Sequence, residues 1–164
     1  MVTVLVASVL IAIGCSGTEE GTDWQTMTLI GAKPVLVELS DGDGVREDGE
    51  GMVFEAELDD QSGKPVARLL GHHLIVDTPG DDGIGDPSLE ERFVTLSMIF
   101  ESGDAILVQG ANVYPADQRL LKADAPQYRA IVGGTGAYKG IRGQVKTTRN
   151  GDEAFTHVLD YTLD

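Results

Sequence analysis

The chain has 164 residues and a formal net charge of −15, and this length suits one domain with a hydrophobic core. Its 27 acidic residues outnumber its 12 lysines and arginines, and such an excess repels nucleic acid, so no nucleic-acid partner is expected. The 21 glycines and six prolines are spread along the chain, which indicates many turns. No long stretch has the 3.6-residue period of an amphipathic helix.

The N-terminal segment is almost wholly apolar over residues 1–13, and Cys15, the only cysteine, follows it. A run this short is typical of a signal peptide, because a membrane-spanning helix needs about 20 residues. We therefore expect a signal peptide over 1–14, a polar tether over 15–23 and a single domain over 24–164. The leader resembles that of bacterial lipoproteins, which implies export and a lipid anchor at Cys15. A plain signal peptide with secretion, or an N-terminal strand, is the alternative.

Alternating apolar and polar residues predict strands through the rest of the chain. In residues 52–59, apolar Met52, Phe54 and Leu58 alternate with acidic residues such as Glu55, which indicates a half-buried strand. By the same reading, strands are expected at 24–30, 34–40, 52–59, 65–76, 92–100, 105–114, 127–132, 144–149 and 153–163.

The strand at 92–100 is apolar on both faces, which is typical of a strand covered on both sides, by the core and by a partner element or subunit. An antiparallel sheet without covering helices closes on itself or folds into a sandwich. Eight strands closed into a barrel leave room for side chains or for one small ligand.

Two acidic, glycine-rich loops lie at 41–51 and 77–86, and such loops resemble calcium-binding loops. In the first loop, Val45 occupies the third ligand position of the EF-hand pattern and Arg46 its glycine position. The pattern is therefore broken, and no metal site is predicted. A solvated loop and a calcium loop both remain open here.

Residues 131–145 form a glycine-rich corner between two predicted strands. It is not a dinucleotide-binding loop, because Lys139 replaces the third glycine and a strand follows. It is not a P-loop either, because no Gly-Lys-Ser/Thr closes it. A turn at Asn150-Gly151 then predicts a terminal hairpin.

The corner sequence Gly-Gly-Thr-Gly-x-Tyr-x-Gly-x-Arg-Gly resembles the allene oxide cyclase and dirigent barrel superfamily. Further matches occur in the same order at Gly49–Phe54, Lys64–Gly71, Val108–Gly110 and Gly140–Lys146. The resemblance implies an all-β fold, an eight-stranded antiparallel barrel with an apolar lumen, assembled as a homodimer or homotrimer. It also implies chemistry without a cofactor, in which the lumen steers a reactive substrate into one cyclisation or coupling geometry.

Three residues are candidates for catalytic roles. Glu38 ends an apolar run, and burial in the lumen would raise the pKa of its carboxyl and suit it to acid–base work. His73 and its neighbour His72 point to opposite faces of one strand, and the resemblance places His73 in the lumen. Arg142 matches the arginine of dirigent proteins and is suited to hold a substrate carboxylate. Ala137 stands where dirigent proteins carry an acid.

Three further residues are predicted to bind substrate. Asn112 and Tyr114 share one face of their strand, and Phe54 lies on the apolar face of residues 52–59. His157 shares a face with Phe155 and is expected in the core.

Two functions follow from this reading. The first is a cofactor-free cyclase or isomerase that acts on an apolar, lipid-derived or polyketide substrate, with most of the rate supplied by positioning. The second is a non-catalytic envelope lipoprotein that binds an apolar ligand or acts as a structural or interaction module.

Overall fold

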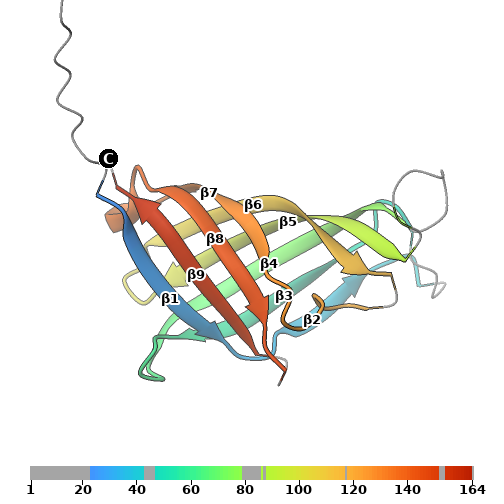
Figure 1. The fold of residues 1–164 in the computed structure, drawn as a ribbon, viewed down its shortest axis with the longest axis horizontal. Coiled ribbons are helices and arrows are strands. Elements are labelled where there is room, and N and C mark those ends of the chain that lie inside the picture. The colour runs from blue at the N-terminus through green and yellow to red at the C-terminus, as the bar shows by residue number, and fades with distance from the viewer. Residues whose placement is uncertain are drawn as a thin grey trace, which may run out of the picture.

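The computed structural model describes residues 23–42, 47–78, 86, 88–116, 118–151 and 154–163. Most of these residues lie in strands or tight turns (Figure 1). The strands are β1 (Gln25–Gly31), β2 (Val35–Leu39), β3 (Gly51–Asp59), β4 (Pro65–Asp77), β5 (Leu89–Phe100), β6 (Ala105–Pro115), β7 (Gln127–Gly134), β8 (Arg142–Arg149) and β9 (Phe155–Thr162), with a short 3₁₀ turn, η1 (Gly136–Tyr138), between β7 and β8.

The strands form one antiparallel sheet in the order β1-β9-β8-β7-β6-β5-β4-β3-β2, and a further pairing of β1 with β3 closes it. The predicted fold class is therefore confirmed: the chain is a closed eight-stranded antiparallel barrel, in which β1 and β2 together form one interrupted strand. Figure 1 shows the long strands crossing the barrel at a steep tilt. Such a tilt is what closing a twisted sheet requires.

The first strand is broken between β1 and β2. Gly31 still pairs with Leu58 of β3, and β2 then continues along β3 from Val35, which pairs with Glu55. Between them, the amide of Ala32 donates to the carbonyl of Glu57 over 3.3 Å. Pro34 has no amide hydrogen to donate to the ladder, so the regular strand stops at residues 32–34 and the chain bends there. The chain nevertheless stays beside β3 on both sides of the bend.

Alternation along each strand fills the inside of the barrel. On β5, for example, Val94, Leu96 and Met98 are buried while Phe93 stays 39% exposed on the outer face. The same alternation carries polar residues inward, so that the buried set also holds His73, Glu90, Arg92, Asn112, Arg129, Thr147 and His157. The homodimer or homotrimer that would cover the outer face of β5 stays a prediction.

The glycine corner connects β7 to β8 through η1. Gly136 (φ +57°) and Gly143 (φ +150°) adopt backbone conformations that favour glycine. A Cβ on Gly136 would overlap the carboxylate of Asp104, and one on Gly143 would overlap the carbonyl oxygen of Asp160. The corner is thus a closely packed piece of structure.

The two ends of the barrel differ. The corner lies where β9 ends and β1 begins, since Arg142 pairs with Thr162, and Tyr161 pairs with Gln25. At the other end, β8 passes Thr147, which pairs with His157 near the start of β9. Residues 1–22, which are the predicted signal peptide and all but the last residue of the tether, lie outside the described residues, as do parts of both acidic loops (43–46 and 79–85). Within the described ranges, no helix is long and apolar enough to span a membrane, and no group of His, Cys, Asp and Glu side chains suits a metal ion.

Candidate functional site

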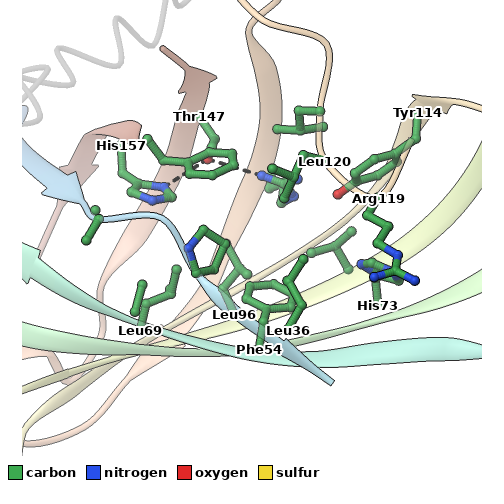
Figure 2. A pocket seen from close by; sticks show the side chains of 18 residues that line it. Leu36, Phe54, Leu69, His73, Leu96, Tyr114, Arg119, Leu120, Thr147 and His157 are labelled. Atoms are coloured by element: carbon green, nitrogen blue, oxygen red, sulfur yellow. Dashed lines mark hydrogen bonds between the residues drawn. The ribbon is translucent and has the colours of Figure 1, made fainter. Parts of the chain in front are cut away.

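A cavity of about 60 Å³ lies inside the barrel at the end opposite the corner. It exceeds the space of one water, about 10–15 Å³, and is far below the roughly 300–1,000 Å³ of most ligand pockets. Its walls are mainly apolar, and they include Pro34, Leu36, Phe54, Ala56, Leu69, Val94, Leu96 and Phe155 (Figure 2). The site is therefore a small apolar chamber, and a larger ligand needs part of its wall to move.

One side of the chamber holds His73, which is only 4% exposed. Its ring lies 6.2 Å from the ring of Phe54 and 5.7 Å from that of Tyr114, measured between centroids. Its Nε2 is 3.5 Å from Arg92 Nη1, at the long limit of a hydrogen bond. His73 thus sits between aromatic groups, beside a buried cation.

That cation, Arg92, is fully buried and pairs with the buried carboxylate of Glu90. Its guanidinium carbon also lies 4.0 Å from the centre of the Tyr114 ring, a favourable cation–π geometry. The buried charges are therefore neutralised within the barrel wall, and the pair shapes this side of the chamber.

Residues 118–121, which we call the strap, cover the chamber. Arg92 donates to the carbonyl oxygens of Gln118 over 2.7 Å and Arg119 over 3.0 Å. Arg149 of β8 donates to the carbonyl of Leu121 over 3.0 Å. Leu120 and Leu121 of the strap line the chamber. Two arginines thus hold an irregular segment in place over the site.

The other side of the chamber holds Thr147 of β8 and His157 of β9 (Figure 2). Arg129 of β7 also lines the chamber and is hydrogen-bonded to Thr147. Arg129 Nη1 donates to Thr147 Oγ1 over 3.1 Å, and Thr147 Oγ1 lies 3.1 Å from His157 Nδ1. Burial lowers the pKa of Arg129, and the Tyr114 hydroxyl opposes this shift. Burial and then the charge of Arg129 lower the pKa of His157 to about 3, so this histidine is neutral at pH 7.

The six predicted site residues are divided by the structure. His73, Tyr114 and Phe54 line the chamber. Asn112 is buried, donates to Gln127 Oε1 over 3.0 Å, and is not among the lining residues.

The remaining two candidates lie away from the chamber. Glu38 is partly exposed and pairs with Arg119 of the strap at 2.7 Å. Arg142 is exposed at the corner, at the opposite end of the barrel. The catalytic roles assigned to Glu38, His73 and Arg142 stay predictions.

Sequence reasoning did not single out Arg129 or Thr147, and it placed His157 only in the core. The only sequence signal for an inward Arg129 is strand alternation, which places it on the same face of β7 as buried Ile131, two residues later. Tyr128 and Val132 on the other face are also apolar yet exposed. The sequence pattern therefore does not say which face of β7 turns inward.

A scan against protein-family models finds no match, and a search of the curated proteins finds none either. Among solved structures, the chain is similar to pyocyanin demethylase, with a TM-score of 0.63 and 20% identity over 84% of this chain and 100% of that one. It is similar to the pterocarpan synthase dirigent protein GePTS1, with a TM-score of 0.59 and 14% identity over 87% and 86% of the two chains. It is also similar to the Diels-Alderase AbmU from Streptomyces koyangensis, with a TM-score of 0.58 and 13% identity over 88% and 71%. The predicted resemblance is confirmed for the fold: the chain has the allene oxide cyclase and dirigent-like barrel fold.

Proposed function

We propose that the barrel binds a small, largely apolar molecule in its chamber and steers it through a cyclisation or isomerisation. The observation that carries the proposal is an apolar cavity with buried polar groups, His73 and Tyr114 on one side and Thr147 and His157 on the other. Apolar walls with a few placed polar groups are typical of sites that orient a substrate. The fold supports the proposal, because a dirigent protein and a Diels-Alderase share it.

The chemistry in this proposal is mainly positioning. Walls that hold two reacting atoms of one molecule together remove much of the entropic part of the barrier. His73 is a side chain in the chamber suited to move a proton, since one imidazole nitrogen can donate a proton while the other accepts one. A lipid-derived or polyketide substrate matches the apolar character of the lining, and its size requires part of the chamber wall to move.

Native mass spectrometry of residues 23–164, followed by solvent extraction and analysis of the extract, tests the proposal. We expect a bound apolar metabolite, which the purified protein converts when the metabolite or its precursor is supplied in excess. A protein that carries nothing, and that binds no member of an apolar small-molecule panel, would contradict the proposal.

A carrier without turnover is the second candidate. It is favoured by the chamber's lining, which contains no Asp or Glu within the described part of the chain. The predicted leader at 1–14 also fits an exported, lipid-anchored protein that presents a ligand outside the cell. Recovery of the extracted ligand in unchanged form after incubation with excess protein would favour the carrier.

A further inference from the structure

Arg129 is a buried cation that has no acidic partner among the described residues. Its side chain comes from β7, faces the chamber and is 5% exposed. Its neighbours are the hydroxyl groups of Thr147 and Tyr114, and no carboxylate among the described residues pairs with it. By contrast, the barrel's other deeply buried cation, Arg92, has Glu90. Burying a charge is costly unless an opposite charge or a full set of hydrogen bonds compensates it.

The hydrogen bonds around Thr147 determine which nitrogen of His157 carries the proton. Thr147 Oγ1 accepts a hydrogen bond from Arg129 Nη1. Its hydroxyl hydrogen then points to His157 Nδ1, which accepts it. A neutral imidazole that accepts at Nδ1 is protonated at Nε2. His157 therefore presents an N–H donor at Nε2.

Two donors at this side of the chamber are unsatisfied. Arg129 Nε and His157 Nε2 are both buried, and neither has a hydrogen-bond partner among the described residues. Both residues line the chamber. Buried donors without acceptors are rare in folded proteins, because each forfeits its hydrogen bonds to water. A negatively charged acceptor in the chamber would satisfy both donors and would also balance the positive charge of Arg129.

We infer that Arg129, Thr147 and His157 form a binding site for an anionic oxygen of the chamber's ligand, such as a carboxylate or an ionised phenol. The inference rests on the proposed function and narrows its substrate class to apolar molecules that end in an acid. Charge-assisted hydrogen bonds from Arg129 would hold the anion, while the apolar wall formed by Phe54 and Leu69 contacts the rest of the molecule. The ligand would then be fixed at one end and free to fold at the other.

The full-length protein is titrated by calorimetry with hexanoate and with hexanamide, which has the same size and no charge. We expect hexanoate to bind at least about tenfold more tightly. A second pair, 4-nitrophenolate and 4-nitroanisole, tells an ionised phenol from a carboxylate. Equal affinity for the charged and neutral members of both pairs would overturn the inference and leave a neutral apolar chamber.

Two substitutions of His157 separate binding from structure. His157→Gln places an amide N–H near the position of Nε2, whereas His157→Asn reaches only the position of Nδ1 and leaves the chamber without that donor. We expect His157→Asn to weaken hexanoate binding about tenfold, and His157→Gln to weaken it less than about threefold. Equal losses in both variants would mean that His157 acts only in the core.

Arg129→Met removes the charge and retains an unbranched side chain, and we expect it to abolish the preference for hexanoate over hexanamide. If this variant does not fold, NMR of the arginine Nε–H signals of the wild-type protein takes its place. We expect hexanoate to shift the Arg129 signal and hexanamide to leave it unchanged.

If both probes bind equally, the anion site fails and the proposed function survives. If no apolar probe binds at all, the proposed function fails with it.

Discussion

Arg92 Nη2 lies 2.7 Å from the carbonyl oxygen of Gln118, so a side chain rooted in the barrel wall ends on the backbone of the strap. The same guanidinium pairs with Glu90 and lies over the Tyr114 ring. A single buried residue therefore joins the wall, the cover and one side of the chamber. Its removal has effects on stability that differ from those of an exposed ion pair.

We predict that Arg92→Met lowers the free energy of unfolding by about 3–5 kcal/mol, because it leaves Glu90 as a buried charge without its partner. Urea denaturation measures this change. The control is the double variant Glu90→Gln/Arg92→Met, which removes both charges and is expected to recover part of the loss. A double variant less stable than Arg92→Met would contradict the argument.

By comparison, the ion pair between Arg119 and Glu38 contributes little. Both side chains are substantially exposed, at 61% and 42%, and exposed pairs are worth roughly 0–1 kcal/mol. We therefore expect Glu38→Gln to change the free energy of unfolding by less than about 0.5 kcal/mol. The same variant tests the predicted catalytic role of Glu38, since turnover of the extracted substrate would fall only if that role is real.

Acid should weaken the fold through His157. Burial lowers its pKa from 6.5 to about 3, so the neutral form stabilises the native state above pH 6.5, and this contribution declines as the pH falls toward 3. Between pH of about 7.5 and 5.5 the loss from one such group is about 1.4 kcal/mol. Urea denaturation at both pH values, in wild type and His157→Gln, isolates it. A difference between the two proteins that does not change with pH would refute the assignment.

Gly71 lies against the ring of Phe54, which lines the chamber. A Cβ at this position would overlap the outer edge of the Phe54 ring and lie 3.0 Å from Leu96 Cδ2. We expect Gly71→Ala to push the ring into the chamber, to cost about 1–3 kcal/mol in the free energy of unfolding, and to weaken binding of apolar probes. Adding Phe54→Leu should restore the binding. Unchanged probe affinity in Gly71→Ala would contradict this prediction, because it would mean that the Phe54 ring does not move into the chamber.

Substitution at the corner should affect stability and leave binding unchanged. In Gly143→Ala, the φ of +150° and the contact with the Asp160 carbonyl oppose the new methyl group, and we expect a loss of about 2 kcal/mol or more. Because the corner and the chamber occupy opposite ends of the barrel, probe affinity should stay within about twofold of wild type. Ala137→Gly is the matched control within η1.

Much of this fold is readable in the sequence because its strands alternate and its turns are marked by glycine. The segment 52–59 is predicted from Met52 and Phe54, and β3 (Gly51–Asp59) follows it closely. His72 and His73 are adjacent on one strand, so their opposite exposures follow from strand geometry alone.

The polar side of the chamber could not be read in the same way. Arg129, Thr147 and His157 lie on three different strands, and their meeting depends on pairing register, which no local pattern specifies. Glu38 shows the converse problem. It shares a face of β2 with Leu36, which lines the chamber, but it lies nearer the end of the strand, where its side chain is 42% exposed and pairs with Arg119 of the strap.

The interrupted first strand has a consequence for how the chamber opens. Among the described strands, β2 is paired only with β3, whereas β1 is held between β9 and β3. Detaching β2 therefore breaks a single ladder, and Pro34 and Leu36, which line the chamber, move with it. Opening the chamber at β2 would leave the pairing of the eight other described strands, β1 and β3–β9, intact, so this edge is the part of the wall that opens at the lowest cost.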